Sequence, residues 1–492
     1  MMKKTLLFCF VAFAVYHSKA QYSLDASFGN ATGYVYLDGL NPSGNTGDEA
    51  DNCKKLIKLP NGHILAVGSV RYTGDGNDLD IGYFELDAAG TDIAHYQHGT
   101  ADDEYVTDAL VLNNVLYFCG YSRDASNVYH GMIGKIDLTS NTPTVTLLPT
   151  AGNSQLNGIA TDGASLYFCG QSVEGSFYQG FIMKTDINFV NDIGFGLGGT
   201  TYTPLQAGGG HSEYYQDILV SNNSLIICGY TSSGDGGIIK ILKTNSATDY
   251  SFTPVLYHPV GSFANFLSIA ESQSDHSLIV VGNYDGIADG ALVGSYNSDG
   301  TPNHSTILNP NSTSTTVFYD VIISNNRVVI TGVQSGYEYI TSLLLPSFTP
   351  DSDFNITDGT DHFNTDYFSN WNMSITGQTA LIDGTDLYIG GRLENYYILG
   401  NTAMAVSRYT SNGAGISENN TNTNFSVFPN PVADELNIES KNQKVESIEI
   451  LNQIGQVVKS TTNSYSIDCS DLKSGSYFVR VNKNEVSKFN KL

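Results

Sequence analysis

A short apolar run closed by a glycine recurs seven times along this chain. In the second copy it reads Leu-Tyr-Phe-Cys-Gly over residues 116–120. The closing glycines lie 52, 50, 59, 53, 50 and 59 residues apart, and they are Gly68, Gly120, Gly170, Gly229, Gly282, Gly332 and Gly391. A nearly constant period of this length is typical of proteins built from repeated structural units. The chain therefore contains seven copies of one unit.

Each unit reads as four β-strands. In the second copy, residues 105–112, 115–120, 131–136 and 144–148 are short runs rich in β-branched and aromatic residues, and we expect residues 121–129 to form a polar loop. Seven four-stranded units favour a β-propeller over a solenoid, because radial closure leaves only short, protected edges. The expected fold class is all-β, namely a seven-bladed β-propeller with a small C-terminal β-sandwich domain.

The repeat also explains its glycines and most of its cysteines. The closing glycine allows either close backbone packing or a positive φ where the chain leaves the sheet. Cys119, Cys169 and Cys228 occupy the position that Val67 and Val281 fill in other copies. We therefore expect them to be buried, free thiols rather than disulfide or metal ligands.

Residues 1–20 have the pattern of a secretory signal peptide, with Lys3 and Lys4, an apolar run and a small residue at the end. No stretch reaches ~18 apolar residues, so we expect no membrane span. Without this segment, which also holds Lys19, the chain has 20 Lys and Arg against 49 Asp and Glu. Such acidity repels phosphates, so we expect no nucleic acid partner for the main domain.

Residues 59–68 read Leu-Pro-Asn-Gly-His-Ile-Leu-Ala-Val-Gly, and residues 291–303 and 403–413 each combine a strand with an Asn/Asp-Gly turn. These segments resemble the delta-sixty repeats of bacterial β-propellers, and in architecture the resemblance covers residues 22–416. In that family the turn continues into a segment similar to residues 23–29 of this chain. We therefore expect residues from about 23 to 37 to pair with the strand at 403–409 and to fasten a ring of sheets.

A change of composition separates a tail from the domain at 21–416. Residues 417–424 are rich in Asn and Thr and predict a flexible linker. Residues 425–492 hold eight basic and eight acidic side chains, a Pro-Asn-Pro start, a Gly-Gln turn and a Leu-x-x-Gly-x-Tyr strand. This series resembles the C-terminal sorting domain, type A, of the type IX secretion system of Bacteroidota. The residues that carry the resemblance are Pro429, Asn430, Pro431, Gly455, Gly475 and Tyr477.

The resemblance implies that the type IX secretion machinery is a partner of the tail. It also implies that the protein passes through the periplasm and ends at the outer cell surface or in the medium. The alternative for the tail is a small, unrelated β-sandwich.

Five polar residues occur at the start of the inner strand in successive copies, and they are Asp108, Asn157, Asp217, Ser268 and Asp320. Inner strands of a propeller surround an axial channel, so these side chains could form a polar ring that holds a cation or a ligand. Alternatively, they tie neighbouring units together through backbone hydrogen bonds, which is the interpretation that we favour.

Asp351, Asp353 and Asn355 show the alternating oxygen ligands of a calcium loop, but Ile356 and His362 replace the Gly and Glu of an EF-hand. A solvated acidic loop is the alternative, and the sequence indicates no other cofactor. No catalytic motif stands in a matching context. We therefore predict a non-enzymatic module that binds an extracellular glycan or protein. The alternative is a secreted glycan-active hydrolase or lyase on a propeller scaffold.

Overall fold

The computed structural model of the chain is built from β-strands. It describes residues 21–29, 32–37, 51–71, 78–149, 152–206, 210–259, 263–285, 290–308, 316–324, 326–334, 337–351, 360–362, 373–395, 401–412, 425–440, 444–452, 457–473, 475–482 and 485–491. All regular elements in these ranges are strands. Among them is no helix long and apolar enough to cross a bilayer. The predicted signal peptide, residues 1–20, lies outside the described residues.

The chain divides into two compact units, residues 1–413 and 414–492. The predicted boundaries at 416, 417 and 424 fall at or close to this division, in a stretch outside the described residues. The first unit contains seven antiparallel sheets, which we number 1 to 7 in chain order and which are all covered by the described residues.

The strands of sheets 1 to 4 follow one another along the chain without crossovers. Sheet 1 consists of β3 (Asn52–Lys58), β4 (Ile64–Arg71), β5 (Leu79–Leu86) and β6 (Asp92–His98). Sheet 2 consists of β7 (Asp103–Leu112), β8 (Val115–Arg123), β9 (Tyr129–Asp137) and β10 (Thr142–Leu147). Sheet 3 consists of β11 (Ser154–Thr161), β12 (Ser165–Glu174), β13 (Phe177–Asp186) and β14 (Thr200–Thr201). Sheet 4 consists of β15 (Glu213–Ser221), β16 (Ser224–Thr231), β17 (Gly236–Leu242) and β18 (Val255–Tyr257).

Sheets 5 and 6 repeat this order, whereas sheet 7 recruits strands from the start of the chain. Sheet 5 consists of β19 (Phe263–Glu271), β20 (Leu278–Asp285), β21 (Gly290–Tyr296) and β22 (Pro302–Leu308). Sheet 6 consists of β23 (Thr316–Ser324), β24 (Arg327–Gln334), β25 (Tyr337–Leu344), β26 (Thr349–Pro350) and β27 (Thr360–His362). Sheet 7 consists of β28 (Met373–Asp383), β29 (Asp386–Asn395) and β30 (Asn401–Asn412), together with β1 (Gln21–Leu24) and β2 (Tyr34–Leu37).

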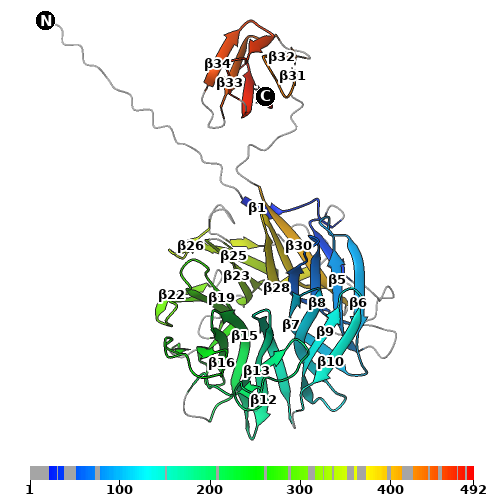
Figure 1. Ribbon diagram of the computed structural model, residues 1–492, viewed down its shortest axis with the longest axis vertical. Coiled ribbons are helices and arrows are strands. Elements are labelled where there is room, and N and C mark those ends of the chain that lie inside the picture. Colours follow the sequence, from blue (N-terminus) through cyan, green and yellow to red (C-terminus); the bar gives the residue numbers. More distant parts are fainter. Residues whose placement is uncertain are drawn as a thin grey trace, which may run out of the picture. The chain divides into compact units, whose positions relative to one another are not determined.

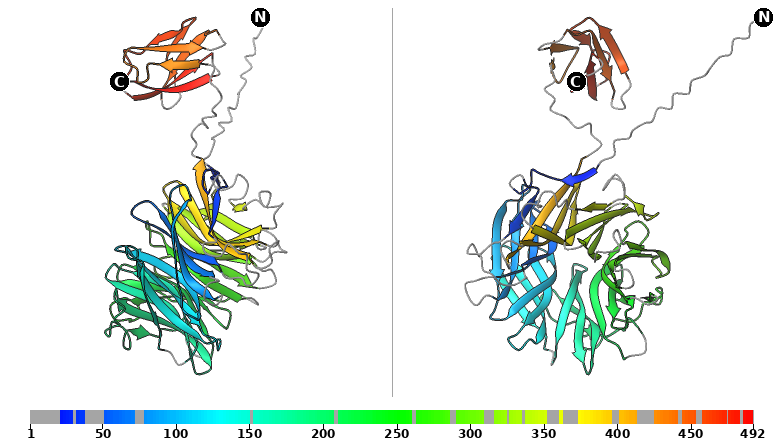
Figure 2. Two further views of the ribbon diagram at one scale, coloured as in Figure 1. Left: turned by 90° about the vertical axis from the view of Figure 1, so that its right-hand side faces the viewer. Right: turned by 180° about the vertical axis from the view of Figure 1, so that it is seen from behind.

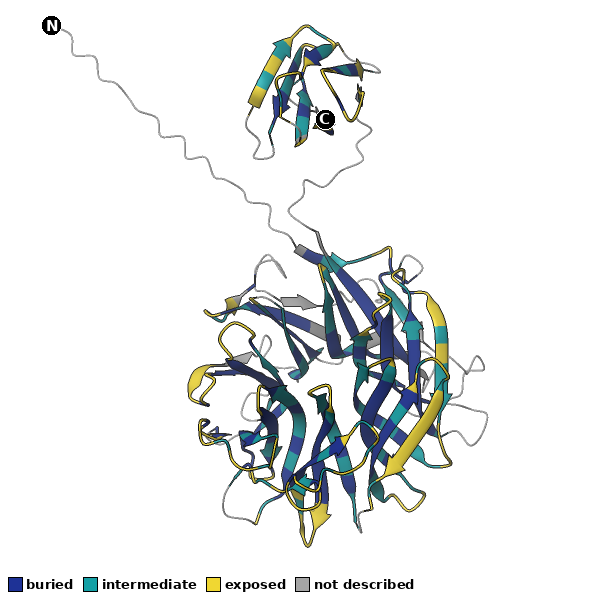
Figure 3. Ribbon diagram, viewed as in Figure 1, coloured by how far each residue is buried: buried dark blue, intermediate teal, exposed yellow. Residues whose placement is uncertain are grey.

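The seven sheets lie side by side around a common centre, with the first strand of each sheet nearest that centre (Figure 1). Outer strands face solvent, and β10 is exposed along its whole length (Figure 3). The second strands, which carry the repeated sequence, are the most buried; in β4 every residue except the last is buried. Their apolar runs are therefore continuous because both faces of each sheet are covered.

The strands expected in the second copy are all present, but the loop predicted at 121–129 is shorter. β8 continues to Arg123 and β9 begins at Tyr129. The reason is a cross-strand aromatic pair, because Tyr121 stacks on Tyr105 with ring centroids 4.7 Å apart. The Arg123 guanidinium then lies 5.6 Å from the centroid of the Tyr105 ring. These contacts favour continued pairing over a loop.

Neighbouring sheets share hydrophobic cores, so each sheet is packed on both faces. Buried side chains of sheets 1 and 2, 2 and 3, 3 and 4, 4 and 5, 5 and 6, and 6 and 7 form six such cores. A seventh core joins sheet 7 to sheet 1, with Tyr388 and Met404 packed among Leu56, Ile64 and Phe84. The first and last repeats are therefore neighbours in space although their closing glycines, Gly68 and Gly391, lie 323 residues apart in sequence.

The N-terminal segment completes sheet 7, as the sequence predicted. β1 pairs antiparallel with the end of β30, with Leu24 opposite Tyr409. β2 pairs with the middle of the same strand, with Val35 opposite Val406. Figure 2 shows the blue start of the chain beside the orange end of the first unit. The predicted pairing of residues 23–37 with the strand at 403–409 is confirmed. Without this segment, β30 would present an unpaired edge.

Between β1 and β2 the chain packs against both sheet 7 and sheet 1, and we call residues 25–29 the clasp. Its Phe28 is fully buried, with its ring 4.9 Å from the Arg408 guanidinium of β30. Arg408 also binds the Asp25 carboxylate at 2.5 Å and the carbonyl of Ala88, in the turn after β5. The amide of Gly29 donates to the carbonyl of the next residue of that turn, Ala89, at 2.8 Å. The clasp therefore connects the first and last sheets through both apolar and polar contacts.

The second unit is a β-sandwich of two antiparallel sheets. One contains β31 (Phe425–Phe428), β32 (Glu435–Ser440) and β35 (Ser466–Asp468). The other contains β34 (Val457–Thr462), β33 (Ser447–Leu451), β36 (Gly475–Val481) and β37 (Glu485–Lys491). Alternating residues of the two sheets bury one common core. The predicted small sandwich is therefore present.

Candidate functional site

Every first strand of sheets 1 to 7 carries a one-residue irregularity at the same place. In β7 the pairing with β8 shifts between Val106 and Asp108, so Thr107 is an extra residue. The residues displaced in this way are Lys54, Thr107, Asn157, Gln216, Leu267, Tyr319 and Gln378. We call them the bulge residues. A β-bulge bends its strand and re-aims the local side chains.

The repeated glycine stands opposite this bulge. In sheet 2, Gly120 pairs with Val106, directly before the bulge residue. A Cβ on Gly120 would lie 1.8 Å from the carbonyl oxygen of Tyr105, and the corresponding distance is 1.7–2.1 Å for all seven closing glycines. Of the two explanations for this glycine, close backbone approach is therefore correct. The glycine and the bulge are two parts of one feature.

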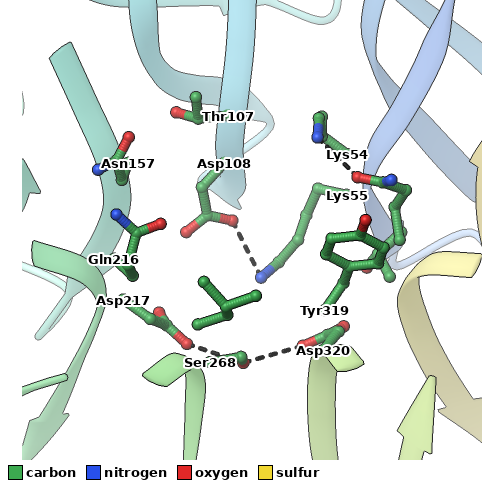
Figure 4. Close-up of a pocket in the computed structure, with 13 residues that line it drawn as sticks. Lys54, Lys55, Thr107, Asp108, Asn157, Gln216, Asp217, Ser268, Tyr319 and Asp320 are labelled. Carbon is green, nitrogen blue, oxygen red and sulfur yellow. Dashed lines mark hydrogen bonds and ion pairs between the residues drawn. The ribbon is translucent and has the colours of Figure 1, made fainter. Parts of the chain in front are cut away.

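The bulges surround one cavity of about 270 Å³, to which the first strand of every sheet contributes (Figure 4). The lining residues are Lys54, Lys55, Thr107, Asp108, Asn157, Gln216, Asp217, Leu267, Ser268, Tyr319, Asp320, Gln378 and Thr379. We call this cavity the axial pocket. It contains all five side chains of the predicted polar ring. They lie in the middle of their strands rather than at the start, because the strands begin several residues earlier than the apolar pattern indicated.

The sequence interpretation missed eight of the lining residues, including both lysines. A positional signal was nevertheless present. In four of the seven copies, the lining residues are those 13 and 12 positions before the closing glycine, for example Thr107 and Asp108 before Gly120, and in a fifth copy Asn157 lies 13 positions before Gly170. Searching only for short polar residues excluded Lys54, Lys55 and Tyr319.

Three aspartates of the pocket also connect adjacent sheets. Asp108 Oδ2 accepts the backbone N–H of Ile159 in sheet 3 at 3.0 Å. Asp217 does the same for Ile269 of sheet 5 at 3.0 Å, and Asp320 for Ala380 of sheet 7 at 2.8 Å. The hydrogen bonds between neighbouring units that we favoured from sequence are therefore present between these three pairs of sheets. On the pocket side, Asp108 Oδ1 contacts Lys55 Nζ, and both Asp217 Oδ2 and Asp320 Oδ1 contact Ser268 Oγ.

Two bulge residues also connect adjacent sheets, but their side chains donate hydrogen bonds to backbone carbonyls of the next sheet. Thr107 Oγ1 donates to the carbonyl of Leu156 in sheet 3 at 2.8 Å. Asn157 Nδ2 donates to the carbonyl of Tyr215 in sheet 4 at 2.6 Å. Each of these bonds joins the bulge residue of one sheet to the residue directly before the bulge of the next sheet.

Opposite charges face each other across the pocket. Lys55 Nζ lies 3.0 Å from Asp108 Oδ1. The carboxylate of Asp108, followed by those of Asp320 and Asp217, raises the pKa of Lys55 despite its burial. Its side chain is nevertheless 37% exposed, because the pocket around it is wide enough to admit water. Lys55 is therefore a fixed positive charge in this site.

Two neighbouring groups have pKa values close to neutrality. Burial, together with the nearby Asp108 charge, raises the pKa of Asp217 to about 6, although Lys55 opposes this effect. Burial and the Arg392 guanidinium lower the pKa of Lys54 to about 8, and its Nζ donates to Gln378 Oε1 at 2.6 Å. Perturbed groups that converge in a cavity are characteristic of functional sites.

The calcium prediction rests on a segment that is only partly described. Asp351 is buried, and its carboxylate forms an ion pair with Arg327 and accepts a hydrogen bond from Ser342 Oγ at 3.1 Å. Asp353 and Asn355 lie outside the described residues. Calcium binding by Asp351, Asp353 and Asn355 therefore stays a prediction.

The cysteines of the repeat are free and buried, as predicted. Cys119, Cys169 and Cys228 have no disulfide partner, and the same is true of Cys53 and Cys469. Burial raises the pKa of Cys53 to about 12 and raises those of the three repeat cysteines as well. Because the thiolate is the reactive form, these residues are packing groups in the cores between sheets.

In the C-terminal sandwich, the residues that carry the sorting resemblance mark chain reversals and one core contact. Pro429 and Pro431 are exposed in the turn after β31, and Asn430 Oδ1 accepts the backbone N–H of Asn490 at 2.9 Å. Gly475 begins β36, and Tyr477 stacks on Phe489 with centroids 5.9 Å apart. Gly455 lies outside the described residues.

Residues 426–492 match the family described as secretion system C-terminal sorting domain. The tail is a sorting domain. Such a domain marks proteins that the type IX secretion system exports to the cell surface or the extracellular space. This chain is therefore an exported protein, and its sorting domain implies contact with the type IX machinery.

No curated protein sequence matches the chain. Among solved structures, the extracellular domain of a one-component system from B. thetaiotaomicron has a TM-score of 0.45 at 11% identity, covering 96% of this chain and 60% of its own. The chain thus spans about 60% of that structure's length. The polysaccharide lyase Uly1 has a TM-score of 0.42 at 9% identity, covering 80% and 97% of the two chains. The β-propeller domain of a protease from Pyrococcus furiosus has a TM-score of 0.36 at 8% identity, covering 78% and 95%.

Proposed function

We propose that the protein is an exported binding module whose first unit is a closed, seven-bladed β-propeller. Two observations support closure. Seven cores join consecutive sheets, including one between sheets 7 and 1, and the clasp binds both of those sheets. Closure would leave no sheet face of the ring exposed. The delta-sixty resemblance, the type A assignment and an origin in Bacteroidota remain predictions of the sequence.

The axial pocket is the proposed binding site, and one observation carries this assignment. All seven first strands place their bulge residue at the same cavity, six of them also place the next residue there, and the lining includes charged groups of both signs. Binding sites are commonly concave, with a few convergent polar groups that fix the orientation of the ligand. At about 270 Å³ the pocket suits a small polar molecule or one terminal group of a larger glycan or protein.

A ligand screen with a blocked pocket tests this proposal. The full mature chain is melted in the presence of mono- and oligosaccharides, amino acids, organic acids, amines and metal salts. Leu267→Trp fills the cavity without removing a charge, and Thr144→Trp on the exposed strand β10 is its matched control. We expect the melting temperature to rise with a ligand in the wild type and in Thr144→Trp, but not in Leu267→Trp.

The same screen separates binding from catalysis. Ligands that stabilise the protein are incubated with it, and products are sought by chromatography. Stabilisation without turnover supports a binding module, whereas product release would favour the secreted glycan-active hydrolase or lyase. Equal stabilisation of Leu267→Trp and the wild type would place the binding site elsewhere.

A further inference from the structure

The axial pocket already holds one cation, which belongs to the protein itself. The Lys55 ammonium is the group that the carboxylates of sheets 2, 4 and 6 surround, and it is paired directly with Asp108. Its Nζ lies in the open centre of the site, whereas the three aspartates come from strands around it (Figure 4). An ammonium group is therefore chemically compatible with this cavity.

Asp217 and Asp320 leave acceptor capacity that Lys55 does not use. Ser268 Oγ lies 3.0 Å from Asp217 Oδ2 and 3.3 Å from Asp320 Oδ1. A hydroxyl has one proton, so it can donate to only one of these carboxylates at a time. The other carboxylate then keeps only its backbone donors, so it can still accept a hydrogen bond from a second cationic donor.

The remaining lining favours a cation that carries carbon over a bare ion. Leu267 and the ring of Tyr319 line the same cavity. Apolar and aromatic groups stabilise the carbon part of an organic ammonium ion and the charge on its nitrogen. These two side chains therefore favour an organic ammonium ion over a metal ion.

From this geometry we propose that the axial pocket recognises a small organic cation. A primary ammonium group is held by Asp217 and Asp320, and its carbon chain packs against Leu267 and Tyr319. The inference rests on the proposed binding function and names its ligand class. Lys55 acts as an internal competitor, because its tethered ammonium occupies part of the same negative field.

The experiment uses n-butylammonium chloride as the probe and the full mature chain as the protein. Butyrate, n-butanol, potassium chloride and calcium chloride are compared with it at equal ionic strength, by thermal melting and by calorimetric titration. The variants are Lys55→Met, which removes the internal cation, and Asp320→Asn. Lys58→Met, on the same strand but paired with Asp383 outside the pocket, is the matched control.

We expect butylammonium alone to raise the melting temperature of the wild type. Lys55→Met should melt lower without ligand, regain stability with butylammonium and bind it about tenfold more tightly, whereas Lys58→Met should match the wild type. Asp320→Asn should weaken binding at least about tenfold. If Asp320→Asn does not fold, Ser268→Ala removes only the shared hydroxyl and should alter the affinity for butylammonium.

Three results would overturn the inference. An equal effect of butanol would indicate apolar binding, an effect of calcium alone would indicate a metal site, and an unaltered affinity in Lys55→Met would show that the ammonium sits elsewhere. These outcomes differ from failure of the proposed function. If other compounds stabilise the wild type but not Leu267→Trp, while amines do nothing, the pocket binds ligands and only the ligand class is wrong.

Discussion

Replacing Phe28 by alanine tests whether the clasp fastens the first sheet to the last. The Phe28 ring is fully buried, 5.9 Å from the Tyr388 ring and 4.9 Å from the Arg408 guanidinium. Removing a buried phenylalanine costs about 3–5 kcal/mol, and the lost cation–π contact adds about 1 kcal/mol. An unfolding entropy of about 2.1 cal/mol/K per residue gives about 0.8 kcal/mol/K for residues 21–413. The melting temperature should therefore fall by about 5–7 °C.

Phe168→Ala is the matched control, because Phe168 is equally buried but packs between sheets 2 and 3. Both variants should lose similar stability by calorimetry. Native-state hydrogen exchange should distinguish them, since local opening exposes only the elements that lose their contacts. Phe28→Ala should accelerate exchange in β1, β2, β30 and the end of β5, whereas Phe168→Ala should affect β8 and β12.

The result that would refute this reasoning is a Phe28→Ala protein with an unchanged melt. A second is faster exchange spread evenly over all sheets. Either outcome would mean that the core between sheets 7 and 1 holds the two repeats together without the clasp.

The remaining predictions concern acidity, thiols and the sorting domain. Burial raises the pKa of Asp217 to about 6 and that of Glu104, a buried residue of β7, to about 7. Their favourable contribution to folding is therefore complete below about pH 4 and is lost as the pH rises through 6 to 7. Denaturant titrations from pH 4 to 8 should show this loss, about 3 kcal/mol for Asp217, and it should shrink in Asp217→Asn; a flat wild-type profile would contradict it. Cys119, Cys169 and Cys228 should resist iodoacetamide until the protein unfolds, and rapid labelling of the native chain would show that the cores open. Deleting residues 425–492 should leave the melt of the first unit unchanged and retain it in the periplasm of its host, and normal export of the truncated chain would exclude a sorting role.

The periodic glycine predicted the repeated sheets because it reports a local backbone requirement. Each of the seven first strands has a bulge, and each bulge requires a glycine on the neighbouring strand, so the glycine recurs seven times in the sequence. The segment at 23–29 was likewise informative, because a strand at the wrong end of the chain indicates where it must pair. The loop after Gly120 was predicted too long because cross-strand stacking of Tyr105 and Tyr121 is invisible until the register is known.

The pocket was less predictable than the fold. Asp108, Asp217 and Asp320 could be located because short polar residues stand out in an apolar strand. The role of Lys55 could not be found from sequence, since a lysine in a strand ordinarily indicates a solvated face. Its pairing with Asp108 depends on the bulge, which turns two consecutive residues towards the centre, and on two sheets meeting there.

In the first unit, the residues that maintain the fold and the residues that line the axial pocket are on different strands. The glycine and the apolar run on the second strand maintain the repeat, while the two residues facing the centre come from the first strand and contribute little to the cores. The bulge residue and its successor illustrate this freedom, since they read Lys-Lys, Thr-Asp, Asn-Gly, Gln-Asp, Leu-Ser, Tyr-Asp and Gln-Thr in the seven copies. Such a scaffold offers seven equivalent positions around one pocket. Mutation, in evolution or by design, can therefore change the ligand selectivity of the pocket one position at a time without disturbing the packing between the sheets.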